Sequence, residues 1–295
     1  MLKLLRPVAA LPGFLVLALL LGVATNAKAG DIGFGKVAVL TNGGGTCVCL
    51  EQNSTVIGGV GIAPNGNMYN AGLITGDLYL DTAGTYFNDG GTIGGSLLQN
   101  AATDNLLKGW DSAASSLSAA DAALPATITS VTSINMTGGS MTITGGPGVN
   151  VIDLPGTGHS GLIMTGGVLT LSAPSGGSFV VNDFGEFMLS GGAKIVLGGG
   201  LGPADVVFNV TEGGPSIEDS SMSGILLALN SQIVIGGDGS YVTGEVIGGG
   251  GGNVKNPEID ISGKTTVSTV PEPSSLVLLG TMIGLTGLCR RKNRP

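Results

Sequence analysis

Arginine is absent from the whole stretch of chain between Arg6 and Arg290. Guanidinium groups commonly hold nucleic-acid phosphates and carboxylate substrates through two-point contacts, so this absence argues against both kinds of ligand. Charged residues make up 11% of the chain and aromatic residues 4%, and His159 is the one histidine. Ser160 follows it, but no nucleophile-elbow sequence surrounds the pair. The composition therefore predicts no nucleic-acid partner, no cofactor and no catalytic residue.

Cysteine is also scarce, because three residues are too few for a disulfide framework. Cys47 and Cys49 are two positions apart, so on a strand both would point to one face, near the upper limit for a disulfide. A strained local disulfide and two thiols both fit this spacing. A metal site would need further ligands, and His159 is distant in the sequence, so we expect no metal here.

Residues 1–29 have the organisation of an export signal. Lys3 and Arg6 form a basic start, residues 11–23 form an apolar core, and Ala27 and Ala29 form a small-residue cleavage site. The sequence therefore predicts a signal peptide over residues 1–29.

Residues 270–295 form a tail in three parts. Pro271, Glu272 and Pro273 come first, and an apolar run over 276–289 follows. This run is shorter than the roughly 20 residues that span a bilayer. Its basic end consists of Arg290, Arg291, Lys292 and Arg294. Such a cluster holds its end of the segment on the cytoplasmic side, so the pattern predicts a transient transmembrane anchor with the upstream chain outside.

This tail resembles the PEP-CTERM sorting signal, which is also catalogued as an ice-binding protein C-terminal domain. In that family a membrane-embedded cysteine peptidase, exosortase, is thought to recognise the Pro-Glu-Pro segment and remove the tail. The resemblance implies that Pro271, Glu272 and Pro273 are recognition residues and that exosortase is the processing partner. The resemblance also implies that the protein is located on the outer surface or in the extracellular matrix of a Gram-negative-type bacterium. An ordinary C-terminal anchor, in which the prolines only interrupt the chain, is the alternative.

Residues 30–269 remain as one domain once both signals are set aside. Five lysines stand there against 19 acidic residues, which gives a net charge of about −14. We interpret this charge as a means of staying soluble outside the cell.

Glycine, at 55 residues, divides this domain into repeated units. Gly58, Gly76 and Gly94 follow one another at steps of 18 residues, and each precedes a short apolar stretch. A period of this length is typical of a β-solenoid with three short faces, and it places Val60 and Leu78 at equivalent inward positions. Similar units recur with looser spacing at glycines 138, 166, 191, 224 and 244. A β-sandwich with glycine turns is the alternative.

Residues 103–124 break the β pattern, because alanine and serine dominate and only one glycine occurs. Apolar side chains recur there at three- and four-residue spacing, at positions 106, 110, 113, 117, 120 and 124. The segment predicts an amphipathic helix capped by Thr103 or Asp104 and ended by Pro125, with Trp110 as a packing anchor.

The predicted fold is therefore mainly β: a glycine-punctuated β-solenoid (β-helix) with one accessory helix, between a signal helix and a C-terminal transmembrane helix. Over about residues 34–262 this layout resembles the ice-binding-like and "choice-of-anchor" surface domains. Ice binders commonly present flat, repeated Thr-x-Thr rows, whereas here Thr142 and Thr144 form one such pair, with no ladder of equivalents in successive coils.

We expect a non-enzymatic surface or matrix protein that acts in adhesion or in association with extracellular polysaccharide, because the sorting signal commonly accompanies exopolysaccharide production. An ice-binding protein is the first alternative. A polysaccharide-acting enzyme is the second, and it would need Asp183, Glu186 or Asp205 to converge in a cleft. Two short motifs, at 237–239 and 263–265, resemble a calcium repeat and a phosphate loop, but each lacks the rest of its pattern.

Overall fold

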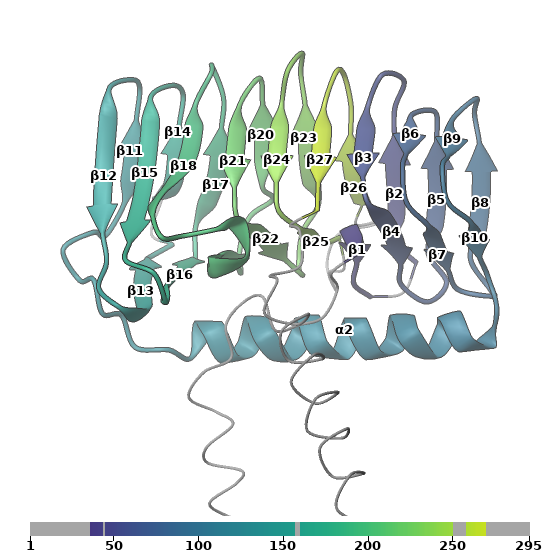
Figure 1. The fold of residues 1–295 in the computed structure, drawn as a ribbon, viewed down its shortest axis with the longest axis horizontal. Helices are drawn as coiled ribbons and strands as arrows, with labels where there is room; N and C mark the ends of the chain where they lie inside the picture. Colours follow the sequence, from purple (N-terminus) through teal and green to yellow (C-terminus); the bar gives the residue numbers. More distant parts are fainter. Residues whose placement is uncertain (1–35, 44, 157–159, 250–257, 270–295) are drawn as a thin grey trace, which may run out of the picture.

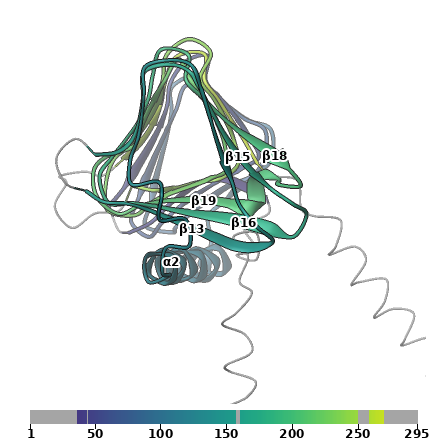
Figure 2. The same ribbon diagram turned by 90° about the vertical axis from the view of Figure 1, so that its left-hand side faces the viewer.

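The computed structural model describes residues 36–43, 45–156, 160–249 and 258–269, and there the chain winds into a three-sided β-solenoid (Figures 1 and 2). Three parallel sheets of nine strands each form its sides, and one α-helix lies alongside. The expected fold class is confirmed. The predicted signal helix and transmembrane helix lie outside the described residues. Within the described ranges, no helix is both long enough and apolar enough to cross a membrane.

The three sheets, A, B and C, differ in the spatial order of their strands. Sheet A contains, from one end of the solenoid to the other, β10 (Leu97–Leu98), β7 (Leu78–Leu80), β4 (Gly59–Ile62), β1 (Val37–Thr41), β25 (Val246–Gly248), β22 (Ile225–Ala228), β19 (Val206–Val210), β16 (Gly177–Asp183) and β13 (Gly148–Leu154). Sheet B contains β8 (Thr85–Asn88), β5 (Asn67–Asn70), β2 (Cys47–Leu50), β26 (Glu258–Ile261), β23 (Ile233–Gly236), β20 (Ser216–Glu218), β17 (Glu186–Leu189), β14 (Gly161–Met164) and β11 (Ile134–Met136). Sheet C contains β9 (Thr92–Ile93), β6 (Leu73–Ile74), β3 (Thr55–Ile57), β27 (Thr266–Ser268), β24 (Tyr241–Thr243), β21 (Ser221–Ser223), β18 (Lys194–Gly199), β15 (Val168–Ala173) and β12 (Ser140–Thr144).

The coils are not stacked in chain order, because the described chain both starts and finishes in the middle of the solenoid. Strands β1 to β10 build one end, α2 (Ala101–Ala122) runs back along the side, and β11 onwards builds the other end towards the middle (Figure 1). There β26 pairs with β2, β27 with β3, and β1 with both β4 and β25. One coil in the middle of the solenoid thus consists of β1 in sheet A, β26 in sheet B and β27 in sheet C, which are the first strand and the last two strands of the described chain.

The predicted register of the first coils is confirmed. Val60 pairs with Leu78, and both side chains are fully buried in the common core. The glycine step also holds at the corner between sheets C and A, where Gly76 stacks on Gly58. A Cβ on Gly76 would lie 2.6 Å from the Gly58 carbonyl carbon, so no larger residue fits there.

The downstream glycines, however, do not all belong to one repeated unit. Gly224 and Gly244 occupy the same C-to-A corner as Gly58. The glycines at 138, 166 and 191 lie instead at the corner between sheets B and C. The sequence alone does not separate them, because both corners favour glycine after a hydroxyl residue.

The helix is confirmed, but it begins and ends two residues earlier than predicted. Asn100 caps it, with its side chain accepting hydrogen bonds from the backbone N–H groups of residues 102 and 103. Trp110, Ala113 and Leu117 pack against sheet A as predicted. Leu106 is 42% exposed instead, and Leu107 and Ala114 are buried there, so the stripe is confirmed in part. Trp110 packs edge-on against Tyr79 with ring centroids 5.2 Å apart, which confirms its packing role.

Hydrogen bonds also attach the helix to sheet A. Asn209 donates to Asn182 Oδ1 at 3.0 Å and to the Ser118 carbonyl at 3.0 Å, and Ser118 Oγ donates to Asn209 Oδ1 at 2.7 Å. Asn182 in turn donates to the Asp121 carbonyl at 2.9 Å. Since α2 lies along sheet A for much of its length (Figures 1 and 2), it covers sheet A, and within the described ranges no helix lies over sheet B or sheet C.

Candidate functional site

Sheet C carries two outward rows that are rich in hydroxyl groups. Residues between them, such as Val242 and Val267, point inward and are buried. In register, the first row is Ser140, Val168, Lys194, Ser221, Tyr241, Thr266, Thr55, Leu73 and Thr92. The second row is Thr142, Thr170, Val196, Ser223, Thr243, Ser268 and Ile57, where the pairing of Lys194 with Ser221 places Val196 beside Ser223.

These hydroxyl rows correct the interpretation that the pair at 142 and 144 has no equivalents. Thr142 pairs with Thr170 in the next coil, and Thr243 lies between Ser223 and Ser268. Serine and threonine occupy five of nine positions in the first row and five of seven in the second. Lys194 is the sole charged residue in either row. Sheet C therefore has a nearly uncharged outer face that carries hydroxyl groups at the spacing of parallel strands.

Sheet B has a different outer face. Its central row runs through Asn135, Ile163, Met188, Ser216, Val234, Asp260, Cys49, Tyr69 and Phe87. Glu186 and Glu218 flank this row. Sheet B thus mixes carboxylates, apolar side chains and aromatic rings, and no regular hydroxyl pattern follows its strands.

A cleft of about 550 Å³ opens at the edge of sheet B, where three successive coils turn towards sheet C. It is lined by Cys49, Leu50, Glu51, Gln52, Tyr69, Ala71 and Asp89. Tyr69 stacks on Phe87 with ring centroids 5.3 Å apart and planes 25° apart, and each of these side chains is 47% exposed. Leu50, Asn70 and Asn88 are in register, so Glu51, Ala71 and Asp89 follow one another at the same corner.

Cys47 and Cys49 lie on β2 and face the same side of sheet B, as their spacing predicts. Their Sγ atoms are 3.4 Å apart, at hydrogen-bonding distance and not joined as a disulfide, and both residues are half-buried. The disulfide stays a prediction. In the described ranges, no group of three or more histidine, cysteine or acidic residues is arranged to hold a metal ion.

The three carboxylates considered for catalysis do not meet. Asp183, at the end of β16, is buried and accepts hydrogen bonds from the N–H groups of Leu162 at 3.0 Å and Gly185 at 2.9 Å. Burial raises the pKa of Asp183 to about 6, and these two hydrogen bonds oppose the rise. Asp205 precedes β19, at the other end of the sheet A strands, where it accepts from the Gly202 N–H at 2.8 Å. Glu186 lies near Asp183, but Asp205 is on a different corner.

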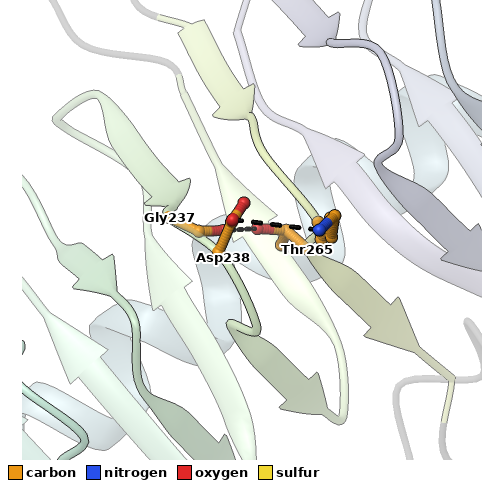
Figure 3. A network of polar contacts seen from close by, with 4 residues as sticks. Gly237, Asp238 and Thr265 are labelled. Atoms are coloured by element: carbon orange, nitrogen blue, oxygen red, sulfur yellow. Dashed lines mark hydrogen bonds and ion pairs between the residues drawn. The ribbon is translucent and has the colours of Figure 1, made fainter.

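The two short glycine motifs are adjacent corner turns between sheets B and C (Figure 3). Lys264 Nζ lies 3.9 Å from Asp238 Oδ2, and Thr265 Oγ1 donates to the Gly237 carbonyl at 3.5 Å. Gly237 and Gly263 both have positive φ, of 84° and 68°. These residues therefore shape two stacked turns, and the ion pair is too exposed to add much stability.

Several sequence predictions fall outside the described residues. They are the signal cleavage site at Ala27 and Ala29, the histidine at 159, the Pro-Glu-Pro motif at 271–273, the apolar run at 276–289 and the basic cluster at 290–294.

Comparison with known proteins bears on both the tail and the domain. Residues 269–292 match the PEP-CTERM protein-sorting motif. No curated protein matches the sequence. Among solved structures, an ice-binding protein from an Arctic yeast is similar with a TM-score of 0.50 and 16% identity, over 84% of this chain and 96% of that one.

Two further solved structures are similar at 16% identity. An ice-binding protein from the Antarctic ascomycete Antarctomyces psychrotrophicus has a TM-score of 0.48, over 83% of this chain and 98% of that one. The DUF3494 domain of a Shewanella frigidimarina ice-binding protein has a TM-score of 0.47, with the same coverage.

At this level of identity the likeness shows the fold and nothing finer. The sorting motif gives information about the location and processing of the protein. It marks an exported protein that passes through the membrane of a Gram-negative-type bacterium and is processed by exosortase. The chain thus carries a PEP-CTERM protein-sorting motif at its C-terminal end, and the domain before it is a β-solenoid with the fold of ice-binding proteins.

Proposed function

We propose that the exported domain is a non-enzymatic ice-binding protein and that the outer face of sheet C is its ice-binding surface. The observation that carries this proposal is the pair of hydroxyl rows. Neighbouring strands lie about 4.8 Å apart, and alternate residues on one strand about 6.6 Å apart, so the sheet fixes these hydroxyls as a two-dimensional array. A rigid array binds an ordered surface through many weak contacts without losing further conformational freedom.

The near absence of charge on sheet C supports the same proposal. A charged group holds its own hydration shell, which a surface of ordered water would have to displace, whereas a hydroxyl group can take a place in a hydrogen-bonded water network. The similar yeast structure is described as an ice-binding protein, and its fold covers most of this chain.

Thermal hysteresis of the exported protein tests this proposal. Replacing Thr243 and Ser268 by lysine places two charges in the second hydroxyl row, and we expect hysteresis to be lost while the fold is kept. Ser216→Lys makes the same kind of change on sheet B and serves as the control. Equal loss in both variants, or no hysteresis in the unmodified protein, would contradict the assignment.

A second candidate function is adhesion or association with extracellular polysaccharide at the cell surface. Two observations favour it: the sorting motif, whose family commonly accompanies exopolysaccharide production, and the aromatic cleft on sheet B. Retention of the exported protein on the producing bacterium's own polysaccharide is the expected result. Elution at the same position as an inert protein of equal size would rule this function out.

A further inference from the structure

We propose that the cleft beside Tyr69 is a saccharide subsite for pyranosides that carry a free amino group. This inference rests on the second candidate function, because it names the site and the ligand class through which the domain would hold a polysaccharide. It is independent of the hydroxyl rows on sheet C.

The size of the cleft fits a small sugar. Its volume of about 550 Å³ falls within the range of pockets that hold small ligands. Ala71 forms part of its lining and lies between Glu51 and Asp89, which occupy the same corner in the two adjacent coils. Because neighbouring strands are about 4.8 Å apart, the two carboxylates lie on coils that are about 10 Å apart. The small side chain between them leaves room for one ring.

The aromatic side chain gives the cleft an apolar surface. Tyr69 lines the cleft directly, and Phe87, on β8 at the end of the solenoid, stacks against Tyr69. Both are large and about half exposed, although most aromatic side chains of this size are covered in a folded domain. An exposed ring suits the C–H groups of a pyranose, and its π-system attracts a nearby ammonium group.

The polar groups of the cleft select the charge of the ligand. Glu51 and Asp89 accept hydrogen bonds from hydroxyl or ammonium donors, and Gln52 adds an amide that can both donate and accept. Among the described residues that line it, there is no lysine, arginine or histidine. With a domain charge of about −14, uronic acids and sulfated sugars are repelled, whereas an amino sugar gains a charge-assisted hydrogen bond.

Binding of defined oligosaccharides to the purified exported protein tests this inference. The probes are oligomers of glucosamine, of N-acetylglucosamine, of glucose and of a uronic acid, titrated by calorimetry. We expect the glucosamine oligomer to bind at least about tenfold more tightly than the acetylated and neutral ones, and the uronic acid not to bind. Raising the salt concentration should weaken the glucosamine complex, because its hydrogen bonds are charge-assisted.

Variants locate the site. Tyr69→Ala should weaken glucosamine binding about tenfold or more, since it removes the ring, and Ala71→Leu should do the same by filling the hollow. Tyr241→Ala removes a tyrosine of similar exposure from sheet C and should leave binding unchanged. Comparable melting temperatures for the three variants would show that each is folded.

The outcomes separate this inference from the function on which it rests. If the protein is retained on the native polysaccharide but Tyr69→Ala and Ala71→Leu bind glucosamine oligomers normally, the subsite is wrong and the function stands. If neutral or anionic oligomers bind as tightly as glucosamine oligomers, the ligand class is wrong. If neither the native polysaccharide nor any oligomer binds, both are wrong.

Discussion

Replacing Leu78 by alanine should test the register of the solenoid more directly than any other single change. Leu78 is fully buried in sheet A, between Val60 of one coil and Leu97 of the next. The substitution removes three carbon atoms, worth about 2.4 kcal/mol at about 0.8 kcal/mol each. The cavity left behind adds to this, so we expect a loss of about 3–5 kcal/mol in the free energy of unfolding.

A matched control is available on the neighbouring strand. Leu73 makes the same kind of pair in sheet C, but it points outward and is 38% exposed. Leu73→Ala is therefore expected to change stability by less than about 1 kcal/mol. Urea denaturation followed by circular dichroism compares the two variants. Similar costs for both changes would show that Leu78 does not point into the core.

Amide hydrogen exchange adds a spatial readout to the same variant. Because each coil contacts only its neighbours, a defect near one end of a solenoid loosens that end first. Leu78→Ala should therefore speed exchange in β5 to β10 more than in β13 and β16 at the far end. A uniform increase along all coils would mean that the solenoid unfolds as one unit.

Three further predictions concern titration, processing and thiol chemistry. Burial raises the pKa of Glu245 to about 7 in the folded protein, whereas in the unfolded chain this carboxyl group loses its proton near pH 4.5, so the stability of the fold falls as pH rises from about 4.5 to 7. Glu245→Gln should remove this fall from the dependence of melting temperature on pH and should stabilise the protein at pH 7 by about 1 kcal/mol or more. Replacing Pro271 and Pro273 by alanine should leave the unprocessed protein in the membrane fraction, whereas the unmodified protein should be exported without its basic end, as intact mass would show. Oxidation of Cys47 and Cys49 should block alkylation of both thiols yet change the melting temperature little, because the loop they close is very short; a large stabilisation would contradict this.

The sequence predicted the first coils well because no insertion interrupts them. The step from Gly58 to Gly76 matches the physical length of one coil, so Val60 and Leu78 could be paired correctly. Later coils carry loops of different lengths, and their glycines turn two different corners. A repeat defined by glycine alone cannot distinguish those corners, since both contain residues with positive φ, which favours glycine.

The helix shows a limit of a different kind. Alanine and serine dominate the segment, so two stripes that differ by one residue are nearly equally apolar, and Leu106 competes with Leu107 for the buried position. Packing against sheet A decides between them, because Leu107 is buried there with Leu40 and Val207, and the helix sequence alone does not contain that contact. The predicted cap was likewise wrong, because Asn100, Thr103 and Asp104 all belong to residue types that cap helices.

The hydroxyl rows could not be read from the sequence, because they cross the junction between the two ends of the domain. Ser268 lies beside Ile57, and Thr266 beside Thr55, although the members of each pair come from opposite ends of the domain sequence. Only the closing of the middle coil makes them neighbours. The corner positions of Glu51, Ala71 and Asp89, by contrast, follow the regular period of the first coils. The glycine repeat could therefore have predicted that these three residues lie next to one another in the cleft.

The same closing coil decides how the faces are presented. The last described residue, Thr269, donates its N–H to the Ile57 carbonyl at 2.9 Å, and the Lys36 carbonyl accepts from Gly59 at 2.6 Å, so both ends of the described domain leave it beside Gly58. This point is the corner between sheets C and A at mid-length, and in a three-sided solenoid it lies opposite sheet B (Figure 2). The sorting motif begins at residue 269, so a domain held by its tail is held at this corner. Sheet B with its aromatic cleft then points away from the attachment, whereas sheet C adjoins it.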